Sequence, residues 1–321
     1  MENYNSLLNY FQELDFYVKI KKTSNQKKEF DFCITINEQA VYIAMKNEIR
    51  PETLAIMNPV FDTTDAVLVA ANYITPKAKA KLKTEKINYI DGFGNAYLNL
   101  LNLKLYVEKG DAKPFTNNSN EIFTTAGAKL LFELLQNPQS INNTYRELAE
   151  KCSIALGSVS KIMKALINEG FAIKINSKNI QLTKRQELLE RWIPLINEKV
   201  LPSYQLDTFQ FGKTNQSNWQ NTNEAIQWAG EPGAALLTNY LNPEKFSLFT
   251  TLTKTEIIKV AGLLPNQSGN ITIYKPFWKS DHNTKKTVPP LLIYAQLIHS
   301  GNARNIETAK LIYNEFLKAN L

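Results

Sequence analysis

Residues 121–183 constrain the fold of this chain more than any other segment does. Apolar residues recur at helical spacing over 124–136 and again over 156–168. Between these stretches, Thr144 and Glu147 have the Thr-x-x-Glu spacing of a capping box, in which each side chain accepts a hydrogen bond from a backbone amide at the start of a helix. The pattern therefore predicts three short consecutive helices.

A hairpin is predicted directly after the third helix. Gly170 ends the helical pattern, since glycine adopts the left-handed conformation found at many helix ends. Residues 171–175 and 180–182 alternate apolar and polar side chains around a polar turn, which is typical of two paired strands. Three helices followed by a hairpin predict a winged helix-turn-helix, with the third helix as the recognition helix.

The third predicted helix has two chemically different faces. Its apolar residues are spaced to pack inward, and they are Val159, Ile162, Leu166 and Ile167. Its outward residues combine hydroxyl groups with cations, and they are Ser158, Ser160, Lys161 and Lys164. Short hydroxyls and lysines on the first half of a recognition helix suit base edges and phosphates. We therefore predict that this face binds double-stranded DNA.

Positive charge is concentrated in the same segment. Residues 141–186 hold eight Lys and Arg and three Glu, a surplus of five within a chain of net charge +7. Such a surplus favours a polyanionic partner. We expect the cations of the hairpin and its surroundings to hold phosphates, and they are Arg146, Lys174, Lys178, Lys184 and Arg185. Because similar helical units also bind proteins, a protein-interaction scaffold is an alternative function.

Residues 1–110 have the pattern of a separate α/β domain that starts with a helix over 1–15. This order matches the restriction-endonuclease-like fold, whose nucleases hold Mg²⁺ with an Asp on one strand and a Glu-x-Lys on the next. Asp31 and Lys46 fit that pattern, but Ala44 stands at the Glu position. Since one carboxylate holds the metal poorly, we interpret Asp31 and Lys46 as relics of an inactive site, or simply as a surface ion pair.

A Mg²⁺-dependent nuclease is the alternative function for this first domain. It requires a carboxylate in place of the one missing at Ala44, and Glu48 and Glu38 are the candidates. Glu48 lies beyond the lysine and Glu38 lies in a predicted turn, so neither is well placed.

The remaining sequence sets the domain boundaries and the compartment. Polar residues and turn formers over 110–120 predict a linker, and residues 184–321 are predicted to form a third domain of mixed α/β type. No apolar run reaches the ~18–20 residues that cross a bilayer, and two cysteines far apart indicate a reducing compartment. We expect a cytoplasmic protein without membrane contact. His282 and His299 lack neighbours at ligand spacing, so we expect no metal and no cofactor.

Five short stretches resemble the AbiEi antitoxin family of transcriptional regulators, which belongs to bacterial type IV toxin–antitoxin (abortive infection) systems. They are YIDGFGNAY at 89–97, TAGAKL at 125–130, WAGEPGAAL at 228–236, YAQL at 294–297 and GNARNIETA at 301–309. The resemblance implies a DNA-binding antitoxin, not an enzyme, that represses its own operon. It also implies a nucleotidyltransferase-like toxin encoded nearby, which the antitoxin counters without necessarily touching it. Only the winged-helix residues carry over as a binding site.

Overall fold

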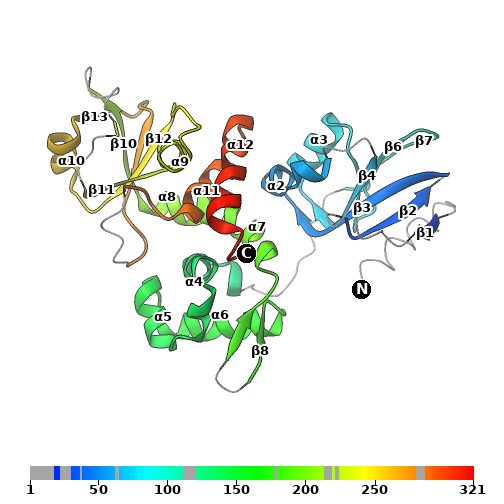
Figure 1. Cartoon of the computed structure of the whole chain (residues 1–321), viewed down its shortest axis with the longest axis horizontal. Helices are drawn as coiled ribbons and strands as arrows, with labels where there is room; N and C mark the ends of the chain where they lie inside the picture. The colour runs from blue at the N-terminus through cyan, green and yellow to red at the C-terminus, as the bar shows by residue number, and fades with distance from the viewer. Residues whose placement is uncertain are drawn as a thin grey trace. The chain divides into compact units, whose positions relative to one another are not determined.

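The computed structural model describes residues 18–21, 30–36, 38–61, 65–110, 121–176, 179–212, 219–220, 224–279 and 286–321. The chain divides into two compact units, Met1–Asn117 and Asn118–Leu321 (Figure 1). Each unit has its own sheet and its own apolar core, so each is described by itself.

A seven-stranded sheet organises the first unit, with its strands side by side in the order of the sequence. The strands are β1 (Val18–Lys21), β2 (Phe32–Ile36), β3 (Gln39–Ile49), β4 (Ala66–Ile74), β5 (Asn88–Asp91), β6 (Ala96–Leu100) and β7 (Leu103–Val107). The helices α2 (Pro51–Phe61) and α3 (Pro76–Thr84) make the two crossovers, so that β3, β4 and β5 run parallel. The other neighbours pair antiparallel.

Both faces of this sheet are apolar. On one face, Leu54 of α2 and Leu82 of α3 pack with Val69 of β4. On the other face, Leu68 of β4 packs with residues of the neighbouring strands, such as Ile43. The near-continuous apolar run of β4 follows from this burial on both sides, which is typical of central parallel strands.

A buried ion pair joins α3 to the end of β5. The Nζ of Lys79 lies 2.8 Å from Oδ2 of Asp91, and the two side chains are 9% and 0% exposed. Oδ1 of Asp91 accepts hydrogen bonds from the backbone amides of Phe93 and Asn95, each at 3.0 Å. Gly94 closes the same turn with φ +81°, a conformation that glycine adopts without steric cost. Asp91 therefore holds both a helix and the turn into β6.

Three helices and a hairpin open the second unit. They are α4 (Thr125–Gln136), α5 (Tyr145–Cys152), α6 (Leu156–Asn168), β8 (Ala172–Lys174) and β9 (Ile180–Leu182). The two short strands pair antiparallel, with Ile173 opposite Gln181. This arrangement confirms the predicted winged helix-turn-helix.

The next helix, α7 (Arg185–Leu195), packs on α4. The side chain of Trp192 is fully buried, and its indole Nε1 donates a hydrogen bond to the carbonyl oxygen of Ala128 at 2.8 Å. Its ring stacks on that of Phe132, with the ring centroids 5.9 Å apart. A π-helical turn over Ile196–Val200 then leads into α8 (Leu201–Tyr204). α7 thus packs the segment after the wing onto the first helix of the winged unit.

A five-stranded sheet forms the rest of the second unit, in the order β11-β12-β14-β10-β13. Its strands are β10 (Gln205–Phe211), β11 (Ile226–Ala229), β12 (Phe246–Thr250), β13 (Leu263–Pro265) and β14 (Ile271–Tyr274). The helices are α9 (Gly230–Thr238), α10 (Lys254–Ala261), α11 (Pro290–His299) and α12 (Ala303–Ile312). α9, α11 and α12 pack on one another, and α11 also packs on α7. Phe209, Trp228 and Leu248 are central to the core of this sheet.

The mixed α/β content and the central winged helix confirm the predicted fold class at this level. The restriction-endonuclease-like assignment of the first domain stays a prediction, as do the boundaries 1–110, 121–183 and 184–321. The helix expected over residues 1–15 lies outside the described residues. Within the described part of the chain, no helix is both long enough and apolar enough to cross a membrane.

Replacing Asp91 with Ala is expected to lower the free energy of unfolding of the first unit by about 3–5 kcal/mol, because the ammonium of Lys79 would lose the carboxylate that offsets its burial. Circular dichroism in urea follows both units. Tryptophan fluorescence follows the second unit alone, since all four tryptophans lie between residues 192 and 278. The dichroism transition should shift while the fluorescence transition keeps its midpoint.

Lys81→Ala is the matched control on the same helix. In the unaltered protein, Nζ of Lys81 lies 3.9 Å from Oε1 of Glu85, and both side chains are partly exposed to solvent. We expect this change to alter stability by less than about 0.5 kcal/mol. Equal effects of the two substitutions would contradict the role assigned to Asp91.

Candidate nucleic-acid interface

The start of α5 is fixed by the capping box that the sequence predicted. Oγ1 of Thr144 accepts a hydrogen bond from the Glu147 amide at 3.3 Å, and Oε2 of Glu147 accepts one from the Thr144 amide at 2.8 Å. The amide and then the hydroxyl of Thr144 hold the pKa of the Glu147 carboxyl below its ordinary value. At the other end, Ser153 has φ +51° and reverses the chain toward α6. These two features determine where α5 begins and ends.

The inner face of α6 locks the helix into the unit. Val159, Ile162, Met163 and Leu166 are all buried. Ile167, which the spacing predicted to pack inward, is half-buried, and Met163 makes the fourth buried contact instead. The orientation of the helix about its axis is therefore fixed, because rotation would expose these apolar side chains.

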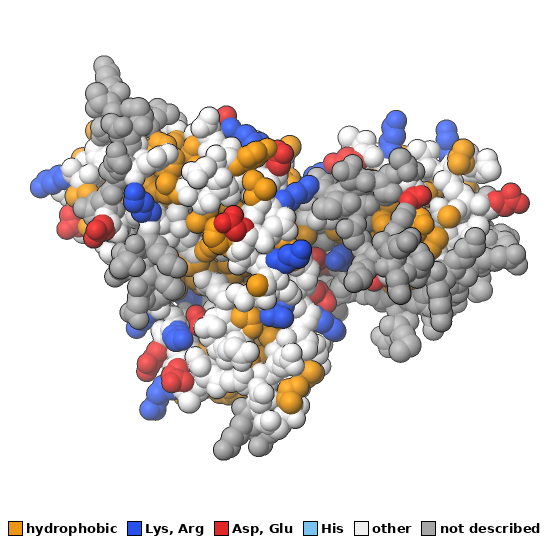
Figure 2. Space-filling model, viewed as in Figure 1, with side chains coloured by type: hydrophobic (Ala, Val, Ile, Leu, Met, Phe, Trp, Pro, Cys, Tyr) orange, Lys and Arg blue, Asp and Glu red, His pale blue; other side chains and the backbone are white. Residues whose placement is uncertain are grey.

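The outer face of α6 is open to solvent. Ser160, Lys161 and Lys164 are exposed and Ser158 is half-buried. Among the described residues, neither lysine makes an ion pair with a carboxylate. The polar face that the sequence predicted is therefore accessible, and its two cations are available to an anionic partner. On the side of the molecule drawn in Figure 2, Lys and Arg side chains are spread singly and not merged into one field.

The wing projects from the end of α6. Gly170 has φ +70°, as expected at the end of this helix, and Lys174 on β8 is exposed. Asn142 anchors the return strand, because its Oδ1 accepts from the Ile180 amide at 2.7 Å and its Nδ2 donates to the Ile180 carbonyl at 3.1 Å. Lys178 lies outside the described residues. Of the two predicted wing cations, Lys174 is therefore the one that the structure places.

The three flanking cations have different surroundings. Arg146 is exposed on the first turn of α5. Lys184 is exposed beyond the wing, and its Nζ lies 5.8 Å from the centroid of the Phe171 ring. Arg185 is half-buried, and its guanidinium donates a hydrogen bond to the Asn320 carbonyl at 2.5 Å. Arg185 is already engaged with the C-terminal residues. A phosphate contact from Arg185 stays a prediction, and its guanidinium is less accessible than the side chains of Arg146 and Lys184.

The fold adds one cation that sequence reasoning missed. The backbone amide of Lys279 donates to the Lys151 carbonyl at the end of α5, at 3.2 Å. Lys279 and Arg146 line the same open hollow of about 480 Å³, together with Ala155 and Leu156 at the start of α6. Lys279 is far from this helix in sequence, and no local pattern links the two. Only the packing of the unit places this lysine beside the recognition helix.

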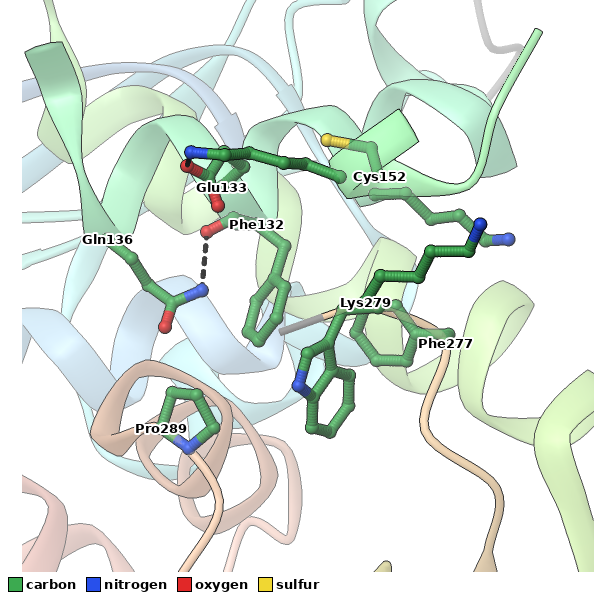
Figure 3. Close-up of a pocket in the computed structure, with 10 residues that line it drawn as sticks. Phe132, Glu133, Gln136, Cys152, Phe277, Lys279 and Pro289 are labelled. Carbon is green, nitrogen blue, oxygen red and sulfur yellow. Dashed lines mark hydrogen bonds and ion pairs between the residues drawn. The ribbon is translucent and has the colours of Figure 1, made fainter. Parts of the chain in front are cut away.

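Aromatic packing holds the Lys279 segment in place. The ring of Phe132 on α4 lies 5.0 Å from that of Phe277 and 5.3 Å from that of Trp278. A small cavity of about 20 Å³ remains beside these rings. Glu133, Phe277 and Lys279 are among the residues that line it (Figure 3). This volume is about that of one water molecule. These ring contacts therefore pack residues 277–279 against the winged helix-turn-helix.

Cys152 lines the same cavity. Its thiol is buried, and this burial, with the Glu133 carboxylate as the next cause, raises the pKa of the thiol to about 12. Because the thiolate is the reactive form of cysteine, Cys152 is protonated and unreactive at neutral pH.

Two of the carboxylates considered for a nuclease site, Asp31 and Glu48, have partners within the first unit. Asp31 is exposed, and its Oδ2 accepts a hydrogen bond from the Met45 amide at 2.6 Å. Lys46 is half-buried on β3, and Ala44, at the position of the missing Glu, packs in the apolar core. Glu48 pairs with Arg50 at 3.1 Å. Asp31 thus ties the residue before β2 to β3, which is a structural role.

Two further residues of the sequence predictions have simple outcomes. Glu38 is exposed with φ +68° in the turn between β2 and β3, as the sequence predicted. His282 lies outside the described residues.

Two family models match the chain. Residues 181–318 match the model described as transcriptional regulator, AbiEi antitoxin, type IV toxin–antitoxin system. Residues 128–172 match the model described as winged helix-turn-helix, DNA-binding. No curated protein and no solved structure gives a significant match. The second match covers α5, α6 and most of α4, so it contains the helix whose outer face is open.

Thr144→Ala is expected to lower the free energy of unfolding of the second unit by about 0.5–2 kcal/mol at pH 7, because an N-cap side chain is lost. Since the folded pKa of Glu147 is lowered, its contribution is present above the unfolded value of about 4.3 and is lost as the pH falls through the folded value. The difference between the wild type and Thr144→Ala should therefore shrink in acid. Tryptophan fluorescence in urea at a series of pH values measures it.

Thr125→Ala provides the control, since Thr125 is exposed at the start of α4 while Thr124 is the residue that caps that helix. We expect a change within about 0.5 kcal/mol. A pH-independent loss in Thr144→Ala would show that the hydrogen bond from the Thr144 hydroxyl to Glu147 does not contribute.

Proposed function

We propose that this chain represses its own operon by binding the operator through α6. Residues 181–318 match the AbiEi antitoxin family of transcriptional regulators and residues 128–172 match a winged helix-turn-helix DNA-binding model, and both matches support the proposal. The proposal rests on one observation above all. The outer face of α6 carries Lys161 and Lys164 in the open, while its inner face is fully packed. A helix held in this way presents a rigid polar face of the width that the major groove of B-DNA admits.

Each proposed contact follows from the chemistry of the side chain. The short side chains of Ser158 and Ser160 let the helix lie close to the base edges, to which their hydroxyls can hydrogen-bond. Lys161 and Lys164 contact phosphates or bases at the rim of the groove. Phosphates beside the groove are held by the surrounding cations, which are Arg146, Lys174, Lys178, Lys184, Arg185 and Lys279. Every cation that neutralises a phosphate releases condensed counterions, so affinity falls as the salt concentration rises.

Membership of the antitoxin family extends the proposal to a second gene. We infer that a nucleotidyltransferase-like toxin is encoded nearby and that this chain counters it in the cytoplasm, with repression of the shared operon as one route. Direct contact between the two proteins is not required for that route. Co-expression of the toxin gene with and without this chain tests whether growth is restored.

Lys161→Glu and Lys164→Glu are each expected to weaken binding to the upstream intergenic duplex several-fold or more, because a phosphate contact is replaced by repulsion. Fluorescence anisotropy with a labelled duplex, over a series of salt concentrations, measures the affinity. The corresponding Ala variants should flatten the slope of log K against log salt by about 0.9 per lost contact.

Lys259→Glu makes the same charge change on α10, which lies far from α6 within the second unit (Figure 1). Its affinity for the duplex should stay close to that of the wild type. If no complex forms at low salt, this proposal is wrong. Capture of a protein partner that is equally efficient after nuclease treatment would favour the protein-scaffold alternative.

Lys279→Ala is expected to reduce the salt slope by about one and to weaken binding equally for all duplex sequences, because a phosphate contact carries no sequence information. The same anisotropy titration, made with the intergenic duplex and with an unrelated duplex, measures both effects. An unchanged slope would remove Lys279 from the interface while leaving the role of α6 intact.

A further inference from the structure

The accessible stripe of α6 has an unusual composition for a helix that reads DNA. We define this α6 stripe as the exposed positions from the start of the helix to Lys164, which are Leu156, Gly157, Ser160, Lys161 and Lys164. None of them is an Arg, Asn or Gln, the side chains that most often read guanine or adenine through two parallel hydrogen bonds. The stripe instead begins with an aliphatic side chain and a glycine.

Leu156 is an apolar side chain placed among charged residues. It is 51% exposed on the first turn of α6. Ala149, Ile154 and Ala155 line the open hollow beside it, so Leu156 is part of a small apolar patch and not an isolated residue. Arg146, Lys279 and Glu150 line the same hollow, so its two cations outnumber its one carboxylate. A partner that fits here therefore presents an apolar group close to negative charge.

Gly157 has no internal reason to be glycine. Its φ does not lie in the left-handed range, and a Cβ built on it would meet no atom within 4 Å. A glycine at such a helical position is less favourable than alanine by roughly 0.5–1 kcal/mol. Its benefit is a bare backbone next to Leu156, which allows a partner to approach the helix closely.

The exposed side chain of Leu156 and the bare backbone of Gly157 together favour thymine among the four bases. In the major groove, the C5-methyl group of thymine is the apolar group that distinguishes the base pairs, and the phosphates of both strands border the groove. We propose that Leu156 and the open backbone of Gly157 read thymine methyl groups, so that the operator is A·T-rich where the start of α6 enters the groove. This inference rests on the proposed DNA-binding function and names the sequence class that the same face selects.

The test uses the full chain and a pool of duplexes with a randomised central segment, selected at low salt. Retained duplexes should be enriched in thymine at one or more fixed positions. Replacing that thymine with uracil removes the methyl group alone, and it should weaken wild-type binding about fourfold, as expected for one buried methyl group. Leu156→Ala should bind the thymine and uracil duplexes equally.

This comparison is a double-mutant cycle, so any general disturbance of the fold by Leu156→Ala affects both duplexes and cancels. Leu311→Ala on α12 is the matched control, since Leu311 is also a partly exposed leucine at 40%. It should keep the full fourfold penalty for uracil.

Gly157→Ala gives a readout that a damaged fold would not produce. The added methyl group favours the helix, so the midpoint of the tryptophan fluorescence transition should rise. Affinity for the selected duplex should fall, because the Cβ occupies the space that the groove needs. A variant that is both more stable and equally tight in binding would overturn the role of Gly157.

The outcomes separate this inference from the function on which it rests. If no duplex is retained at low salt, the DNA-binding proposal itself fails. If duplexes are retained but the wild type binds thymine and uracil equally, or Leu156→Ala keeps the fourfold penalty, thymine readout is overturned while DNA binding stands. Retained duplexes with no position enriched in thymine would overturn it in the same way.

Discussion

The packing of Trp192 against α4 is the contact on which the second unit depends. Its indole donates to the carbonyl of Ala128 and stacks on Phe132, so α7 is held to the first helix of the winged unit. Phe132 in turn contacts Phe277 and Trp278, which brings the segment that ends in Lys279 to the end of α5. One aromatic cluster therefore positions both the recognition helix and a distant cation beside it.

The division of α6 into two faces links this packing to function. Four buried apolar side chains fix the orientation of the helix about its axis. In that orientation its lysines and hydroxyls face the solvent. Because the inner face determines where the outer face points, substitutions on the outer face change binding with little effect on stability. The exposed leucine and glycine at the start of the helix add selectivity for one base to the general attraction between lysines and phosphates.

Local patterns predicted the elements that local interactions determine. The bounds of α6, the capping box at Thr144 and the hairpin after Gly170 all agree with the sequence, because each depends on residues within a few positions of one another. The sequence did not yield β10 or β11, because their pairing partners lie far along the chain. The same holds for two cations of the candidate site: tertiary contacts alone bring Lys279 beside the start of α6 and engage Arg185 with Asn320.

The most direct test of the account is the chemical reactivity of individual lysines in the intact protein, with and without an excess of the upstream intergenic duplex. Limited acetylation followed by mass spectrometry reports each lysine separately. We expect the duplex to protect Lys161 and Lys164 strongly and to leave Lys259 on α10 as reactive as before. Equal acetylation of Lys161 and Lys164 in the two states would contradict the claim that the outer face of α6 lies against DNA.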